Sequence, residues 1–368
     1  MKASYSFHGL VDIEIDQQQL DLISFYDHYF RLLRSATPGK GNVYAVREYA
    51  SCNLPSGCRE VGSAYRGFSS GICSLPERYA LDWKNGGLTE YTDSPNRATN
   101  LWLQQMLLGK GLSLVHSAGL SLGGKGFVFP AFGGAGKTML IAALRHDPDF
   151  RFFGDDFVAV DGTGRIYSYP SDLSIYEQHL ELFPELSGSV YGRYFAERER
   201  RRVAWQEWYR LPGNPLLRRL AMPLRGAIDP RTLPPPFPLL PAWDLDYVKV
   251  PVTEVIPRER IGTTAPLSGC LLLSRYAGSD FRVERIAADE LVRRIMGILA
   301  VEFRYSLVYL HLLEAFGIVD AHSLERRQQE ILAACCERTE LYEIMIPAEI
   351  SLQDYGDRMA TLVRELAR

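Results

Sequence analysis

Residues 126–146 read GFVFPAFGGAGKTMLIAALRH, and this stretch decides the fold class. An apolar run typical of a strand leads into the small residues 133–136, and a run typical of a helix begins at Lys137-Thr138. Glycines allow successive backbone N–H groups to curl around a polyphosphate, and a helix N-terminus adds N–H donors and partial positive charge. A strand, a glycine loop and a helix in this order predict a phosphate-binding loop.

The residue types in the loop predict a separate task for each side chain. Lys137 is expected to reach the β- and γ-phosphates of a nucleotide, and the Thr138 hydroxyl is expected to ligate Mg²⁺. Ala131 stands where the phosphate-loop pattern has its first glycine, a position that supports the turn and does not touch phosphate. A glycine-rich turn before an ordinary helix is the alternative interpretation. The phosphates would be held by the backbone of Gly133, Gly134, Ala135 and Gly136.

Two adjacent acids, Asp155 and Asp156, follow Lys137 after 18 and 19 residues. The interval accommodates a helix of ~10 residues and a turn before a strand that returns beside the loop. Phosphoryl transfer uses one carboxylate for the metal and another to accept the proton of the nucleophile. In common GTPases and ATPases the metal-side Asp comes much later in the chain, so the short interval is discriminating. Two exposed acids at a strand end are the alternative.

His116 and Arg151 complete the set of candidate site residues. His116 lies in the strand-like run LSLVHSAGLSL, residues 112–122, where a hydrogen-bonded core histidine is the alternative to a catalytic one. Arg151 opens the run that carries the two acids. Its guanidinium would either bind phosphate or face solvent, and the sequence does not separate these two interpretations.

Composition excludes several classes of protein. The chain has 368 residues, of which 46% are hydrophobic and 23% charged, with a formal net charge of −3. These values argue against a disordered chain, and the near-zero charge argues against a nucleic-acid partner. No apolar run approaches the ~20 residues of a membrane span, and the first residues lack the apolar segment of a secretory signal. A cytoplasmic protein without a membrane partner is expected.

The cysteines are expected to be buried, reduced thiols. Cys52, Cys58 and Cys73 stand fairly close in sequence, but no histidine or fourth cysteine accompanies them at the spacing of a zinc finger. A metal site at these three residues is the weaker alternative. The remaining cysteines are Cys270, Cys335 and Cys336.

The order of segments predicts an α/β (α+β) chain with three parts. Residues 1–95 mix strand and helix signals, including an alternating run at 4–15, and predict an N-terminal α/β subdomain. Residues 96–285 are expected to form the nucleotide domain, with an Arg-rich helical insertion at 174–241, and residues 286–368 to be mainly helical. Residues 150–160, FRFFGDDFVAV, are expected to form one strand, followed by a hairpin.

With these residues in hand, the stretch 112–170 resembles the HPr kinase/phosphorylase superfamily, most closely its divergent HPr-kinase-related branch. In that family a His-containing strand leads into a glycine phosphate loop, and a short helix returns to an Arg-hydrophobic-hydrophobic-small-Asp-Asp strand. Residues 151–156, RFFGDD, match that last element. The resemblance implies a P-loop core like the nucleotide domain of phosphoenolpyruvate carboxykinase, with a mixed β-sheet.

The resemblance also implies roles and partners. Asp155 would be the general base and Asp156 the Mg²⁺ ligand, although the order could be reversed. The cofactors would be ATP and Mg²⁺, and a homo-oligomer would fit because related kinases assemble into rings.

Two departures from the family pattern put HPr itself in doubt as the acceptor. Phe150 stands where HPr kinases proper carry a histidine, and 169–186 lack their glutamate-x-arginine-glycine signature. The sequence therefore predicts an ATP-dependent kinase acting on a hydroxyl of a peptide, a protein or a small molecule. A nucleotide-binding regulatory module with weak or no transferase activity is the alternative, and decarboxylation lacks a recognisable oxyacid-site signature.

The acceptor site is expected in the helical, basic region 174–225. Its arginines and tryptophans would bind an anionic or bulky acceptor, whereas a solvated helix face is the alternative interpretation. The residues concerned are Arg193, Arg198, Arg201, Trp205 and Trp208.

Overall fold

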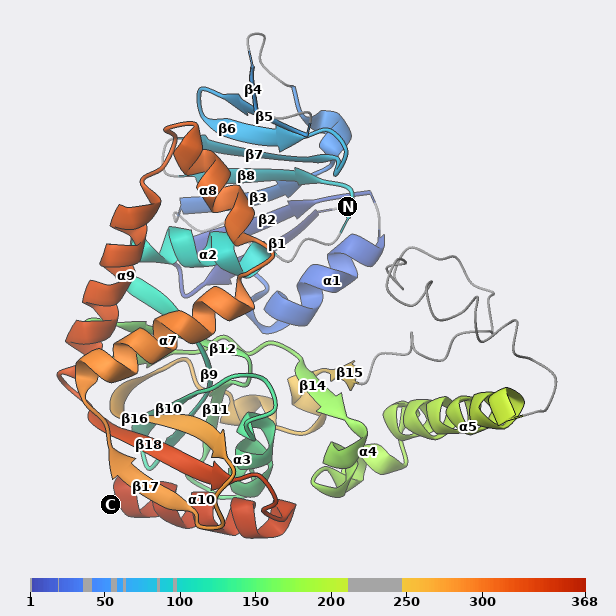
Figure 1. Cartoon of the computed structure of the whole chain (residues 1–368), viewed down its shortest axis with the longest axis vertical. Coiled ribbons are helices and arrows are strands. Elements are labelled where there is room, and N and C mark those ends of the chain that lie inside the picture. The colour runs from blue at the N-terminus through green and yellow to red at the C-terminus, as the bar shows by residue number, and fades with distance from the viewer. Residues whose placement is uncertain are drawn as a thin grey trace. The chain divides into compact units, whose positions relative to one another are not determined.

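The computed structural model describes residues 2–18, 20–35, 42–53, 58–61, 64–84, 87–94, 98–210 and 247–368. The chain forms two compact units: Met1–Asp172 with Pro251–Arg368, and Leu173–Val250. Both contain helices and strands, and the sheets of the larger unit mix parallel and antiparallel pairs, which confirms the expected mixed α/β class (Figure 1).

The first sheet of the larger unit has eight strands in the order β1-β2-β3-β8-β7-β6-β5-β4. β2 pairs with β3 and β3 with β8 in parallel, and the other neighbours are antiparallel. The connection from β2 to β3 contains helix α1 (Leu20–Phe30). The strands are β1 (Lys2–Phe7), β2 (Val11–Asp16), β3 (Asn42–Arg47), β4 (Arg59–Val61), β5 (Tyr65–Phe68), β6 (Gly71–Ser74), β7 (Tyr79–Lys84) and β8 (Gly87–Thr92).

The alternating run at 4–15 is not one strand but a hairpin of β1 and β2. His8 and Gly9 occupy the turn with φ angles of 52° and 71°. Left-handed backbone at two successive residues reverses the chain without interrupting the alternation of buried side chains. The alternation of apolar and polar residues therefore continues across the turn, and periodicity alone does not show where the turn lies.

The second sheet of the larger unit carries the phosphate-loop segment. Its order is β10-β9-β12-β13-β16-β18-β17, β11 also pairs with β9, and β10 pairs with β16 in parallel. That last pairing closes β10, β9, β12, β13 and β16 into a circuit. The strands are β9 (Leu112–Leu122), β10 (Lys125–Pro130), β11 (Arg151–Gly154), β12 (Phe157–Asp161), β13 (Arg165–Tyr167), β16 (Thr264–Tyr276), β17 (Arg282–Arg285) and β18 (Glu340–Pro347).

The expected single strand over 150–160 is interrupted. β11 and β12 both pair with β9, and Asp155 and Asp156 form a bend between them. The register of β11 against β9 also shifts between Phe152 and Gly154, as in a β-bulge. Bulges and bends redirect side chains, and here the redirected residues are the two acids. The expected hairpin of β12 and β13 is confirmed.

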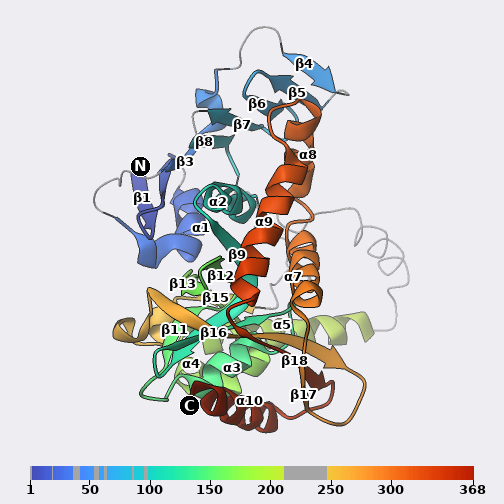
Figure 2. The same cartoon turned by 90° about the vertical axis from the view of Figure 1, so that its left-hand side faces the viewer.

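Helix α2 (Thr99–Leu108) lies between the two sheets of the larger unit (Figure 1). Most of its residues are buried, and it packs on β2 and β3 on one side and on β9 on the other. One hydrophobic core includes residues of both sheets and of α2. The expected C-terminal helices are α7 (Ala288–Glu302), α8 (Leu307–Ala315), α9 (Ala321–Cys336) and α10 (Leu352–Ala367); Figure 2 shows α7, α8 and α9 on one face.

The smaller unit is built on a two-stranded antiparallel sheet, β14 (Leu173–Tyr176) with β15 (Tyr247–Val250). The short helix α4 (Pro184–Ser187) and the long helix α5 (Val190–Arg210) follow β14. Arg193 and Arg198 lie on α5. Residues 211–246 and the side chains of Arg201, Trp205 and Trp208 lie outside the described part of the chain.

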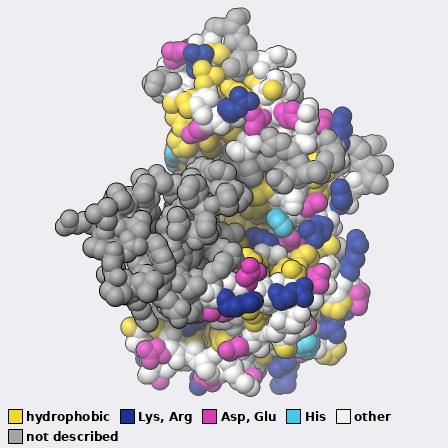
Figure 3. Space-filling view, turned by 90° about the vertical axis from the view of Figure 1, so that its right-hand side faces the viewer, with side chains coloured by type: hydrophobic (Ala, Val, Ile, Leu, Met, Phe, Trp, Pro, Cys, Tyr) yellow, Lys and Arg dark blue, Asp and Glu magenta, His cyan; other side chains and the backbone are white. Residues whose placement is uncertain are grey.

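In the described segments, no single helix combines the length and apolar composition needed to cross a membrane. The pair α7 and α8 meets both criteria together but is bent by 95° between the helices. Side chains of both charge signs are interspersed over the described part of the face in Figure 3, in keeping with the net charge of −3.

Candidate active site

The phosphate loop connects the end of β10 to the start of α3 (Lys137–Leu144). Gly134 and Gly136 have φ angles of 79° and 113°, a region that glycine enters without steric cost. A Cβ atom added at Gly133 or Gly134 would meet nothing within 4 Å. The backbone of the loop is therefore open on the side where these glycines lie, which leaves room for a phosphate.

The inner side of the loop is held by α10. The Tyr355 hydroxyl donates a hydrogen bond of 3.1 Å to the carbonyl oxygen of Gly136. A Cβ atom at Gly136 would lie 2.9 Å from the Tyr355 side chain, and residues with a side chain rarely adopt its φ angle of 113°, so a substitution there is strained. Ala131 is fully buried at the start of the loop, consistent with a supporting position. The contacts of Gly136 with Tyr355 fix the start of α3 relative to α10.

Lys137 is nearly enclosed at the base of the loop. Its side chain donates to the carbonyl oxygens of Ala131 at 3.1 Å and Phe132 at 3.3 Å, and the residue is 7% exposed. Burial lowers the pKa of Lys137, while the negative charges of Asp156, Asp155 and Glu302 act in the opposite direction. The ammonium thus lies in the field of three carboxylates.

The structure brings the two acids to the start of α3. The Thr138 hydroxyl donates a hydrogen bond of 2.8 Å to Oδ2 of Asp155. Asp155 is 2% exposed and Asp156 is half-buried. The backbone N–H of Ser117 in β9 donates to the carbonyl oxygen of Asp156 at 3.1 Å, which ties the bend to the strand. The strand after α3 therefore returns beside the loop, as the short interval predicts.

His116 lies on β9 directly opposite Phe157, the residue after the two acids. Its ring contacts the Phe157 ring at 5.2 Å between centroids, and its Nδ1 lies 3.7 Å from Oε1 of Glu302. Burial, and secondarily the charge of Lys137, lowers the pKa of His116 to about 4. His116 is therefore neutral near pH 7 and belongs to the same cluster as Lys137.

Glu302, the last residue of α7, is a member of the site that the sequence did not indicate. Burial raises its pKa, and Asp156 adds to that shift while Lys137 opposes it. No motif surrounds this residue. Only the packing of α7 against β9 places its carboxylate near His116 and Lys137.

Arg151 is not brought to this cluster. It pairs with Ser121, whereas the loop follows the part of β10 that pairs with Ser117. Its guanidinium donates to the carbonyl oxygens of Pro148 at 3.1 Å and Phe150 at 2.8 Å. Because β11 runs from Arg151 toward the acids, its first residue lies at the opposite end of the strand from the loop.

The oxygen ligands that could hold a metal ion here are few. In the described segments, no group of three or more His, Cys, Asp or Glu side chains could hold one. Mg²⁺ bound with phosphates needs only one or two carboxylates from the protein, because phosphate oxygens and water complete its shell. Thr138 with Asp155 or Asp156 fits that requirement.

All six cysteines are free thiols, and four of them are buried. Burial raises the pKa of Cys52 to about 11, so its reactive thiolate is scarce near neutral pH.

Comparisons with known proteins place the chain in no family: no family model matches it, and no curated protein does. The candidate site therefore stands on its geometry.

His116 is expected to make stability fall as the pH is lowered. The pKa of His116 is about 4 in the folded chain and about 6.5 in the unfolded chain. Between these two pH values the unfolded chain therefore binds the proton more readily than the folded chain does. The stabilisation is complete above pH 6.5 and is lost as the pH falls toward 4, by up to ~3 kcal/mol. Urea unfolding from pH 4 to 8 should show this loss in the natural chain and a smaller one in His116→Gln. The exposed His146→Gln is the control, and an unchanged pH dependence in His116→Gln would contradict the prediction.

Proposed function

We propose that this protein is an ATP-dependent, Mg²⁺-requiring phosphotransferase that moves a γ-phosphoryl group to a hydroxyl of a peptide, a protein or a small molecule. The proposal includes the HPr-kinase-like assignment and a P-loop core like that of phosphoenolpyruvate carboxykinase. The observation that carries it is the Thr138–Asp155 hydrogen bond, which joins the phosphate loop to the paired acids. Sequence patterns indicated the loop and the acids separately, and this bond supports treating them as one site.

The residues present fit ATP and Mg²⁺. The metal would find hard oxygen donors in the Thr138 hydroxyl and the Asp155 carboxylate, and the phosphates would meet the open backbone at Gly133 and Gly134. When bound, Mg²⁺–ATP supplies the phosphoryl group and the cation that neutralises its charge. Lys137 would exchange its two carbonyl partners for phosphate oxygens.

The geometry favours one order for the two acids. Asp155 already contacts the hydroxyl expected on the metal, so we assign it to the metal with Thr138. Asp156 is less buried and is left to accept the proton of the acceptor hydroxyl. This is the reverse of the order implied first by the family resemblance.

His116 and Glu302 are assigned to the field around Lys137. A neutral His116 adds no positive charge beside the ammonium, and the Glu302 carboxylate helps Lys137 to stay protonated against burial. Lys137 thereby keeps the charge that it needs to stabilise a transferring phosphoryl group.

Product analysis by phosphorus NMR tests the proposal. The protein would be incubated with ATP, Mg²⁺ and separate hydroxyl compounds, including Ser-, Thr- and Tyr-containing peptides, sugars and glycerol. A phosphate ester formed together with ADP supports the kinase. ATP binding without ester formation would support the regulatory module, and absence of ATP binding would contradict both.

Gly133→Ala is expected to weaken ATP binding without unfolding the chain. The added methyl group meets nothing within 4 Å, so the free energy of unfolding should change by less than about 0.5 kcal/mol. The same methyl group occupies the space that a phosphate would use, and we expect at least a tenfold loss of affinity for Mg²⁺–ATP, about 1.4 kcal/mol. Calorimetric titration measures the affinity.

Gly188→Ala is the matched control because a Cβ atom there also meets nothing within 4 Å, at a position outside the loop. Equal ATP affinities in the two variants would show that phosphate does not bind along the loop backbone.

A further inference from the structure

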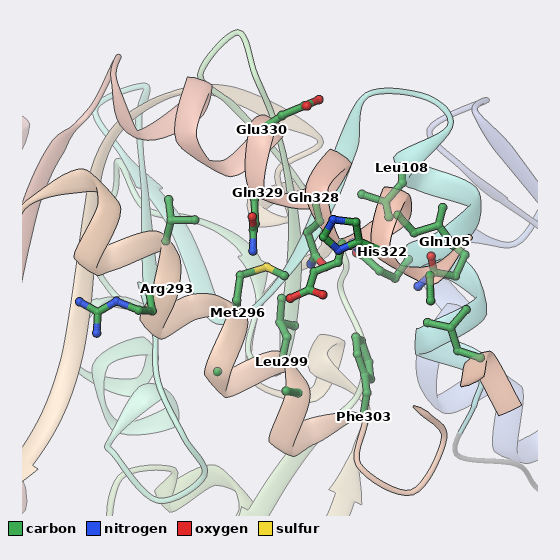
Figure 4. A pocket seen from close by; sticks show the side chains of 18 of the residues that line it. Gln105, Leu108, Arg293, Met296, Leu299, Phe303, His322, Gln328, Gln329 and Glu330 are labelled. Atoms are coloured by element: carbon green, nitrogen blue, oxygen red, sulfur yellow. The ribbon is translucent and has the colours of Figure 1, made fainter. Parts of the chain in front are cut away.

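A cavity of about 1150 Å³ lies among α2, α7, α8 and α9 in the larger unit. These helices are seen together in Figure 2, and Figure 4 shows the cavity from close by. Its volume is slightly above the range of about 300–1,000 Å³ that is usual for small-molecule sites. The candidate active site makes no use of it: neither the phosphate loop nor the paired acids line it.

Much of the cavity wall is apolar. Leu101 and Leu108 of α2 line it together with Met296 and Leu299 of α7, and Phe303 lies at the end of α7. Figure 4 shows Met296, Leu299 and Phe303 along one side of the hollow. An apolar wall of this kind takes up the hydrocarbon part of a ligand, because burying that surface releases it from water.

Four glutamines, Gln104, Gln105, Gln328 and Gln329, line the cavity, and they differ in their hydrogen bonds. Gln104 accepts from the backbone N–H of Leu114 at 2.6 Å, and Gln328 donates to the Ser113 hydroxyl at 3.2 Å. Gln105 is 7% exposed, and its buried Oε1 has no hydrogen-bond partner among the described residues. Leaving a buried amide oxygen unsatisfied costs ~1–3 kcal/mol, so a ligand donor that reached this oxygen would remove that cost.

The charged side chains around the cavity are mostly acidic. Arg293 is the one Lys or Arg among the residues that line it, and Glu290 on the same helix already pairs with this guanidinium. No ion pair within the described part of the chain involves Asp289, Glu325 or Glu337. The acids that line the cavity are Asp289, Glu314, Glu325, Glu330 and Glu337.

We propose that this cavity binds an amphiphilic amine, with its hydrocarbon part against the apolar wall and its protonated amino group among the acids. An ammonium N–H is also the kind of donor that the Oε1 of Gln105 lacks. An anionic amphiphile would be repelled by the same acids, and a neutral one would gain the apolar contacts and at most a hydrogen bond to Gln105, without the attraction of the acids. The proposal does not depend on the proposed phosphotransferase activity.

Three probes with hydrocarbon chains of similar length separate the apolar contacts from the effect of charge. They are octylammonium, octanol and octanoate, each used below its aggregation concentration. Calorimetric titration of the full chain at pH 7 and low salt is expected to show octylammonium binding at least tenfold more tightly than octanol, and octanoate more weakly than both. Raising the salt to 0.5 M should reduce the preference, because ions screen the acids. Absence of octylammonium binding, or octanoate binding equally well, would overturn the proposal.

Variants locate the site. Ala300→Phe and Met296→Trp place bulk in the cavity from α7, and each should reduce octylammonium affinity at least tenfold with an unchanged unfolding temperature. Ala300 is exposed, so its replacement leaves the core intact if Met296→Trp fails to fold. Unchanged affinity in a folded variant would mean that the amine binds elsewhere.

Removal of charge tests the acids. In Asp289→Asn combined with Glu325→Gln, the preference for octylammonium over octanol should fall to less than about threefold, while octanol affinity stays the same. Glu284→Gln on β17 is the matched control at an exposed acid away from the cavity. A preference that survives the double substitution would overturn the assignment of the amino group to these acids.

Discussion

Lys137→Ala is expected to abolish the stabilisation of the protein by Mg²⁺–ATP and to lower any phosphoryl transfer by at least about 10²–10³-fold, the size of effect found when one donor to developing charge is lost. Lys137 is the lysine that begins α3; the residue is 7% exposed, and its ammonium lies in the field of three carboxylates. Without it, those carboxylates would repel the phosphates. Thermal unfolding with and without 5 mM Mg²⁺–ATP measures the ligand-dependent shift, since a ligand that binds only the folded state raises the unfolding temperature.

Each variant is compared with its own ligand-free baseline, because loss of a buried cation changes stability by itself. Lys110→Ala, at an exposed lysine outside the loop, should keep the full shift. An undiminished shift in Lys137→Ala would remove the phosphate-loop assignment.

Asp155→Asn and Asp156→Asn are expected to impair transfer by different routes. An Asn at 155 can still accept the hydrogen bond from Thr138, but it loses the negative charge, so the Mg²⁺ concentration needed for ATP binding should rise. An Asn at 156 should leave Mg²⁺–ATP affinity within threefold and lower the chemical step by ~10²–10⁴-fold, the usual size of a general-base effect. Metal titrations and single-turnover measurements on both variants assign the roles.

Asp149→Asn provides the control at an exposed acid before β11. If Asp156→Asn instead raised the Mg²⁺ requirement while Asp155→Asn did not, the roles would be reversed. Near-normal transfer in either variant would contradict the use of paired acids.

The parts of the site that could be predicted from the sequence are those written in short, local patterns. The loop at 133–138 and the acids at 155–156 are separated by only one helix and one strand, so a strand that returns beside the loop brings them together. Glu302 could not be predicted, because its place depends on how a distant helix packs against β9. Arg151 is close to the acids in sequence but not in space. It begins β11, whereas the acids follow the other end of that strand.

In the fold, too, features with a local sequence pattern could be predicted and others could not. The mixed α/β class and the C-terminal helices follow from periodicity, whereas two backbone irregularities do not. The turn at His8-Gly9 and the bend at Asp155-Asp156 both preserve the apolar pattern on either side, so each looks like continuous strand in the sequence. The closing pair β10–β16 joins segments far apart in the chain, and nothing local in either strand specifies its partner.

Because β14 pairs with β15, the segment that forms the smaller unit begins and ends at neighbouring positions. Leu173 lies directly opposite Val250, so the place where the chain leaves the larger unit and the place where it returns are neighbours, about 5 Å apart. A gap of that width can be bridged by a two-residue turn such as Asn-Gly. Evolution could therefore lengthen, replace or delete the segment between Leu173 and Val250 without breaking the register of any strand in the larger unit. Chimeras that replace this segment would keep the phosphate loop and the paired acids, because both lie in the larger unit.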